Sequence, residues 1–205
     1  MLAAALLVAL AAPVRLPPVD LCNGDAEFNR LRGQLERSIA KRNFDELISL
    51  MSDDVRISFG GGVGRESFRL RWASPQDRAL LWKELGEAAR LGCAKAMDGQ
   101  GREYRAMPAM FVTSDGLDGF STWVARPGAA LRSGPRSTSA IRMRLPAWTV
   151  LDEVEHDGSP SIAARTPKGR RGYVSTAEAR SIIDYRIVFG RRDGQWRITA
   201  FVAGD

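Results

Sequence analysis

The chain has 205 residues, of which 44% are hydrophobic and 26% are charged, a composition typical of a soluble globular protein. This length allows one domain or two small ones. The formal net charge of +6 predicts a basic surface. The sequence has no Lys/Arg cluster of the kind that contacts nucleic acid, so we expect no nucleic-acid partner.

An apolar run at residues 1–12 ends near an Ala-x-Ala pattern at Ala9–Ala11, and no Lys or Arg precedes it. The run is too short to cross a bilayer as a helix, which needs about 20 residues. Its length is typical of a signal peptide. A buried N-terminal helix is the alternative, but Pro13, Pro17 and Pro18 would break it. We therefore expect a periplasmic or secreted protein with no transmembrane segment in the mature chain.

The two cysteines are Cys22 and Cys93. In an exported chain such a pair predicts one disulfide, and two unpaired thiols in the core are the alternative. A metal site is not expected, because His156 is the single histidine and no Cys-x-x-Cys spacing occurs. We also expect no cofactor.

Residues 20–118 have mostly helical patterning and predict a helical N-terminal domain. Apolar residues recur at steps of three and four from Phe28 to Ile39, which gives a helix one apolar face. Alternation at Val55–Phe59 predicts a strand, and the glycines of Gly60–Gly64 follow it as a tight turn. Capping residues mark the helix ends: Asn23 or Asp25, Asn43, Ser74 before Pro75, and Gly92.

After Tyr104 the spacing of apolar residues changes to every second position, which is typical of strands. Short apolar stretches, beginning with Met110–Val112, are separated by Gly-containing turns. The clearest hairpin lies in residues 181–205, across the Asp193-Gly194 turn. We expect this hairpin to pack on the N-terminal domain. Its inward faces are predicted to consist of Tyr185, Ile187 and Phe189 on one strand, and Trp196, Ile198, Ala200 and Val202 on the other.

Two blocks between Ala130 and Arg180 resemble the bacterial SH3 domain family. The block Ala130–Asp152 carries Leu131, Arg132, Gly134 and Pro135 at the family's opening positions. The block Arg165–Arg180 resembles the family's last hairpin, with a Lys168-Gly169 turn and Gly172-Tyr173-Val174 after it. The resemblance implies an SH3-like β-barrel over residues 119–180.

The resemblance also implies a binding surface that contains Arg132, Pro135, Trp148 and Tyr173. Its ligand would be peptidoglycan or a protein or peptide of the cell envelope. The tryptophan that the family usually has before its fourth strand is missing from Ser159–Ala164, which puts a conventional groove in doubt.

A second resemblance is to the cystatin-like roll of nuclear transport factor-like proteins, in which helices precede a curved sheet that ends in an Asp-Gly-x-Trp hairpin. It implies an enzyme or a small-ligand binder with a pocket in the N-terminal domain. Glu66 is the candidate acid, in a pocket lined by Phe59 and Trp72. The favoured alternative is that Glu66 lies on a solvated helix face. A cysteine peptidase is disfavoured, because His156 is not in a suitable context with either cysteine.

The sequence therefore predicts an α+β protein. A helical N-terminal domain is completed by the C-terminal β-hairpin, and an SH3-like barrel occupies the second half. The predicted function is a non-enzymatic cell-envelope binding protein.

Overall fold

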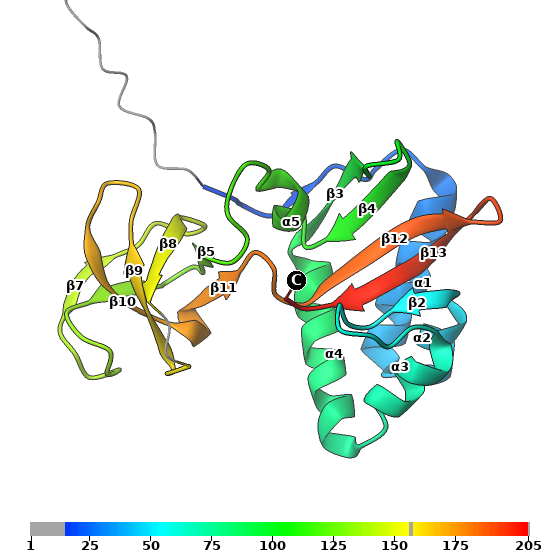
Figure 1. The fold of residues 1–205 in the computed structure, drawn as a ribbon, viewed down its shortest axis with the longest axis horizontal. Coiled ribbons are helices and arrows are strands. Elements are labelled where there is room, and N and C mark those ends of the chain that lie inside the picture. Colours follow the sequence, from blue (N-terminus) through cyan, green and yellow to red (C-terminus); the bar gives the residue numbers. More distant parts are fainter. Residues whose placement is uncertain (1–14, 156–157, 205) are drawn as a thin grey trace, which may run out of the picture. The chain divides into compact units, whose positions relative to one another are not determined.

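The computed structural model describes residues 15–155 and 158–204. The predicted signal peptide, residues 1–12, and His156 lie outside these residues. The described chain forms two compact units. We call residues 17–120 with 181–204 the α+β unit, and residues 15–16 with 121–180 the β unit (Figure 1).

Side-chain caps define the helices of the α+β unit. Asp25 accepts a hydrogen bond from the Phe28 backbone N–H, and Asn43 and Ser74 cap two later helices in the same way. Pro75, whose missing N–H costs nothing in a first turn, follows Ser74. The helices are α1 (Ala26–Lys41), α2 (Phe44–Ser49), α3 (Arg65–Arg71), α4 (Pro75–Arg90) and α5 (Met110–Thr113).

The sheet of the α+β unit is mixed. Its spatial order is β1 (Val19–Asp20), β3 (Gly92–Met97), β4 (Glu103–Met107), β12 (Arg186–Arg192), β13 (Gln195–Val202) and β2 (Met51–Arg56). The strands β12 and β13 form a hairpin, and the outer pairs β1–β3 and β13–β2 are parallel. The segment from residue 181 onward therefore supplies two central strands of a sheet whose other strands precede residue 108.

Helices α1 and α4 lie against one face of this sheet, and the core fills the space between them (Figure 1). Phe28 of α1 packs edge-on against Phe189 and Trp196, with ring centroids 5.1 and 5.5 Å apart. Because successive strand residues point to opposite faces, the neighbours of these core residues point away from the helices. We call that second side the open face.

The N-terminal region differs from the predicted helical domain, because it supplies the four strands β1 to β4 to the sheet. The predicted strand Val55–Phe59 overlaps β2 only at Val55 and Arg56, because β2 runs from Met51 to Arg56 and Ile57–Phe59 lie outside it. Met110–Val112 is part of helix α5, in which the Thr113 N–H donates to the Ala109 carbonyl. Three apolar residues are too few for periodicity to separate a strand from a helical turn.

Cys22 and Cys93 form the disulfide that the sequence predicts, and both are buried in the core. The bond joins the segment after β1 to strand β3, which β1 also pairs with through its backbone. Among the described residues, no helix is long and apolar enough to cross a membrane.

The β unit contains β5 (Thr122–Ala125), β6 (Ala130–Arg132), β7 (Ile141–Arg144), β8 (Val150–Glu155), β9 (Ser161–Arg165), β10 (Arg171–Ser175) and β11 (Ala179–Ser181), with a 3-10 turn at Thr176–Glu178. The spatial order is β11-β5-β8-β9-β10-β6-β7. No pairing among the described residues joins β7 to β11, so the sheet is open. The predicted closed SH3-like barrel over residues 119–180 is therefore wrong.

Candidate functional site

The open face of the six-stranded sheet is hollowed. Strand alternation places Val188 and Gly190 of β12 on this face, because Ile187 and Phe189 belong to the core. A pocket of 650 Å³ lies over these strands, and we call it the open-face groove. Its apolar floor and aromatic walls consist of Val188, Gly190, Ala200 and Val202, with Phe59, Tyr104 and Phe111.

Arg186 is the buried cation of the groove, with only 2% of its surface exposed. Its guanidinium carbon lies 4.5 Å from the ring centroid of Phe111 and 5.3 Å from that of Phe59. Its Nη1 and Nη2 atoms donate to the carbonyls of Ile183 and Gly204, each at 2.8 Å. The side chain is therefore held rigidly, and it ties the end of β13 to the start of β12.

Arg56 is one of five arginines that line the groove, and it is exposed at the end of β2. Its guanidinium carbon lies 5.9 Å from the ring centroid of Phe59. Within the described residues, no carboxylate lies within ion-pair distance of Arg56. A ligand anion would therefore meet a cation here that no acidic side chain neutralises.

The carboxylates at the rim of the groove are already engaged by arginines. The Asp54 carboxylate accepts from Nε and Nη2 of Arg192 at 3.0–3.2 Å, and this pairing lowers the pKa of Asp54. Hydrogen bonds from the backbone and side chain of Arg102 lower the pKa of Asp98 in the same way. Both groups are therefore ionised acceptors near neutral pH and are poor proton donors.

Tyr104 separates the groove from an adjoining pocket of 510 Å³ below α5 and the 114–119 loop. Burial raises the pKa of Tyr104, and the nearby charges of Asp115 and Asp98 add to the effect. Its hydroxyl is therefore neutral at physiological pH and available as a hydrogen-bond donor. Phe111 lines both pockets as well, so these two rings form the wall between them.

The acid site considered at Glu66 is not present, and the alternative that the sequence favoured, a solvated helix face, is confirmed. Glu66 is exposed on α3, and it does not line the groove. Trp72 is 1% exposed and packs inside the core against Tyr185 and Phe201. The open-face groove therefore lies on the opposite face of the sheet from the acid site that the sequence suggested.

Arg132, Pro135 and Tyr173 do come together in the β unit, where they line a pocket of 540 Å³. The register of the sheet explains this, because Arg132 of β6 lies directly opposite Tyr173 of β10. Ser161 of β9 lies opposite Ser175 of β10, on the same face. Trp148 does not line this pocket; it is half-buried, and its backbone N–H donates to the Ala125 carbonyl at 2.7 Å.

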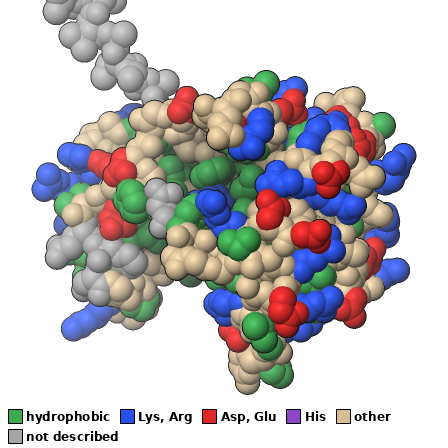
Figure 2. Space-filling model, turned by 45° about the vertical axis from the view of Figure 1, so that its right-hand side comes forward, with side chains coloured by type: hydrophobic (Ala, Val, Ile, Leu, Met, Phe, Trp, Pro, Cys, Tyr) green, Lys and Arg blue, Asp and Glu red, His purple; other side chains and the backbone are tan. Residues whose placement is uncertain are grey.

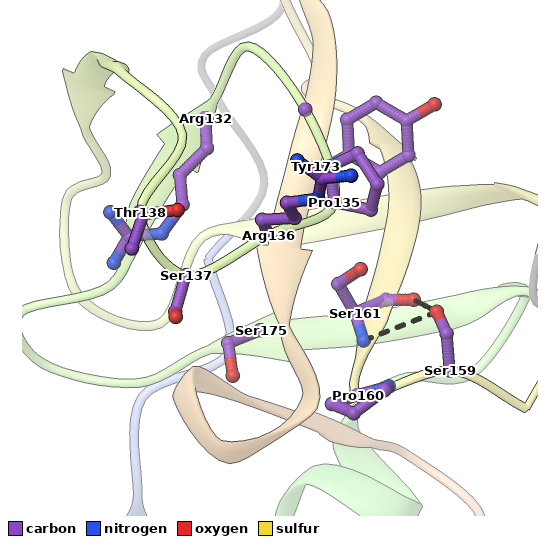
Figure 3. A pocket seen from close by; sticks show the side chains of 11 residues that line it. Arg132, Pro135, Arg136, Ser137, Thr138, Ser159, Pro160, Ser161, Tyr173 and Ser175 are labelled. Atoms are coloured by element: carbon purple, nitrogen blue, oxygen red, sulfur yellow. Dashed lines mark hydrogen bonds between the residues drawn. The ribbon is translucent and has the colours of Figure 1, made fainter.

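Hydroxyl side chains that the sequence did not single out complete this second pocket, which we call the hydroxyl pocket. In Figure 3, Ser137 and Thr138 of the 133–140 loop lie across from Ser159 and Ser161. Its other lining residues are Gly134, Arg136, Pro160 and Ser175. Serine and threonine in loops are too common in sequence for this clustering to be predicted without the register.

Surface charges elsewhere are mixed rather than segregated. Figure 2 shows Lys and Arg side chains interspersed with Asp and Glu on one face of the molecule. Several exposed arginines of the protein form ion pairs, such as Arg69 with Asp45 at 3.0 Å and Arg71 with Asp77 at 3.1 Å. Such pairs stabilise a fold weakly, and they leave the net charge of +6 without a large basic patch on this face. Among the described residues, no group of three or more His, Cys, Asp or Glu side chains is placed to hold a metal ion.

No family model matches the chain, and no curated protein sequence matches it. Its structure is similar to that of Aln2 from a Streptomyces species, with 8% identity, a TM-score of 0.33 and 87% of each chain covered. It is similar to an NTF2-like protein with a cystatin-like fold from Novosphingobium aromaticivorans, with 12% identity and a TM-score of 0.31 over 86% of this chain and 77% of that one. A protein of unknown function with a cystatin-like fold from Nostoc punctiforme has 8% identity and a TM-score of 0.28 over 86% of each chain.

These similarities are too distant to assign a family. The resemblance of residues 130–180 to the bacterial SH3 domain family is wrong, since no family model matches and the sheet is open. The sequence analysis predicted a cell-envelope protein that binds peptidoglycan or a protein partner through an SH3-like module. That prediction depended on the resemblance and is wrong as well.

Proposed function

We propose that the α+β unit is a binding protein for a small amphipathic anion, with its site in the open-face groove. The ligand has an aromatic or apolar body and one carboxylate or similar acidic group. The observation that carries this proposal is Arg56, an exposed arginine that has no carboxylate partner in the described part of the chain and lines an aromatic and aliphatic pocket of 650 Å³.

The apolar body would contact the floor and walls of the groove. Val188, Ala200 and Val202 present aliphatic surface there, and Phe59, Tyr104 and Phe111 present rings. A pocket of several hundred Å³ with mostly apolar lining and a few fixed polar groups is typical of small-molecule sites.

The acidic group of the ligand would pair with Arg56. The rim carboxylates do not compete for it, because Asp54 is paired with Arg192 and Asp98 with Arg102. A guanidinium binds a carboxylate through two parallel hydrogen bonds, which adds orientation to the attraction.

We propose binding without catalysis. The ion pairs that keep Asp54 and Asp98 ionised make these two rim carboxylates poor general acids. We also propose that the protein acts in the periplasm or outside the cell, where the Cys22–Cys93 disulfide would persist.

Calorimetric titration with 2-naphthoate and with neutral 2-naphthalenemethanol tests this proposal. Wild-type protein should bind the anion more tightly, and Arg56→Gln should weaken its binding about tenfold. Arg30→Gln, which removes an exposed charge from α1, should change the affinity less than twofold. Equal effects of the two substitutions, or equal affinity for the neutral compound, would exclude an anion site at Arg56.

A groove-filling variant tests the location independently of charge. Ala200→Leu adds bulk to the floor of the groove and should abolish 2-naphthoate binding without unfolding the protein. Ala40→Leu makes the same change on the exposed surface of α1 and should leave binding unchanged. Undiminished binding by folded Ala200→Leu would contradict the proposed site.

A further inference from the structure

The hydroxyl pocket of the β unit has a lining that is unlike that of the open-face groove. Two arginines, Arg132 and Arg136, line it together with five serine and threonine side chains and the phenol of Tyr173, and no carboxylate is among its lining residues. Glu178 pairs with Arg132 at 3.1 Å but does not line the pocket. In the described part of the chain, Arg136 has no acidic partner. Such a lining favours an anion that accepts several hydrogen bonds.

Two polar atoms of the lining are buried and have no hydrogen-bond partner in the structure, namely Arg132 Nε and Ser161 Oγ. Ser161 is only 6% exposed, and Nη2 of Arg132 is already occupied by Glu178. A buried donor without an acceptor is costly, and native proteins rarely keep one without a reason. Both atoms belong to residues on the same face of the sheet, on strands β6 and β9, which β10 joins.

We propose that the hydroxyl pocket binds a phosphate ester. The phosphate oxygens would accept hydrogen bonds from the Arg132 and Ser161 side chains and pair with Arg136. A phosphate group presents more acceptor oxygens than a carboxylate, so it can accept from several separate donors at once, and both kinds of anion form charge-assisted hydrogen bonds with arginine.

The remaining space in the pocket favours an ester over the free phosphate ion. The pocket measures 540 Å³, which is several times the roughly 30 Å³ occupied by a water molecule and ample for a phosphate with an organic body. Pro135, Pro160 and Tyr173 provide apolar and ring surface on which that body would pack. This site lies in a different unit from the open-face groove, so neither proposal depends on the other.

Calorimetric titration of the full chain with phenyl phosphate at 150 mM salt tests the proposal. Arg136→Gln should weaken binding about tenfold, because it removes a charge-assisted pairing. Arg170→Gln removes an exposed charge from the same unit but outside the pocket, and it should change the affinity less than twofold. Equal loss in both variants would assign the binding to the general surface charge and overturn the proposal.

Ser161→Ala and Ser133→Ala form a second matched pair, since Ser133 is an exposed residue outside the pocket. We expect Ser161→Ala to weaken phenyl phosphate binding at least threefold with an unchanged melting temperature, and Ser133→Ala to have no effect. Inorganic phosphate should bind at least tenfold more weakly than phenyl phosphate. If it binds as tightly, the organic body makes no contribution and the ester proposal fails. Absence of binding by wild-type protein at millimolar phenyl phosphate would also overturn it.

Discussion

The guanidinium of Arg186 stacks on the ring of Phe111 at 4.5 Å, and this contact joins the first residue of strand β12 to helix α5. The two residues are far apart in sequence, and both line the open-face groove. The hydrogen bonds of Arg186 to Ile183 and Gly204 fix the guanidinium independently of the ring. The stacking can therefore be removed by itself.

Phe111→Leu should lower the affinity for 2-naphthoate several-fold and the free energy of unfolding by about 1 kcal/mol, the usual size of a cation–π contact with some lost packing. Phe120→Leu is the matched control, because Phe120 is 68% exposed and lines neither the groove nor its neighbour. Titration calorimetry and urea denaturation measure the two effects. An unchanged affinity in Phe111→Leu would mean that the ring is not part of the site.

Gly92 is required by the close approach of strand β1. A Cβ atom at Gly92 would lie 2.0 Å from the Val19 carbonyl oxygen, and the residue has a φ of +80°. Gly92→Ala should therefore destabilise the protein by about 3 kcal/mol or more in urea denaturation. Gly101→Ala shares the positive φ but has nothing within 4 Å of its Cβ, so it should cost only about 1 kcal/mol. Equal losses would show that backbone strain, and not the contact with Val19, decides the stability.

The disulfide between Cys22 and Cys93 spans 71 residues, so its removal should have a large effect. The chain-entropy model gives about 4 kcal/mol for a loop of this length. The double variant Cys22→Ala/Cys93→Ala should lose that amount in urea denaturation. Addition of a thiol reductant should lower the melting temperature of wild type but not that of the double variant. A reductant effect on the variant would point to a cause other than this bond.

The stabilisation that the Asp25 carboxylate gives to the start of α1 depends on pH. Its carboxylate accepts from the Phe28 N–H, which lowers its pKa from the ordinary 3.8, and Trp196 and Arg105 reinforce the effect. The pKa of Asp25 is lower in the folded state than in the unfolded state, so the ionised carboxylate stabilises the fold. This stabilisation is complete at pH values above the unfolded-state pKa and is lost as the pH falls through the folded-state pKa.

The free energy of unfolding should therefore fall between about pH 5 and pH 2 more steeply in wild type than in Asp25→Asn, which keeps a capping side chain but cannot titrate. Asp53→Asn changes an exposed residue and should follow the wild-type curve. Equal slopes in all three proteins would show that Asp25 does not contribute to acid stability.

Local signals in the sequence predicted the starts of helices α1, α2 and α4. Asp25, Asn43 and Ser74 are the caps that the structure contains, because capping depends on residues only two or three positions away. The disulfide was also predictable, from the number of cysteines and the expected export.

The open face was not predictable from alternation alone. A β-bulge between Ile198 and Ala200 inserts one extra residue into β13 and reverses the pattern beyond it. Phe201 therefore enters the core, while Ala200 and Val202, predicted to be inward, line the groove. A bulge depends on the partner strand, which a single sequence does not specify.

For the hydroxyl pocket, part of the lining was predicted from the sequence, but for the wrong reason. The sequence named Arg132, Pro135 and Tyr173 through a family resemblance that proved wrong, and yet the sheet brings these residues together. Ser161 was missed because a site built from three strands and two loops depends on the register between β6, β9 and β10.

Chemical-shift mapping of the isotope-labelled full chain with 2-naphthoate tests the central claim most directly. The open-face groove predicts saturable shifts in the backbone amides of Val188, Gly190, Ala200 and Val202, with those of α1 and of the β unit unchanged. Shifts confined to the β unit or to the helix-covered face, or no saturable shift at millimolar ligand, would contradict it.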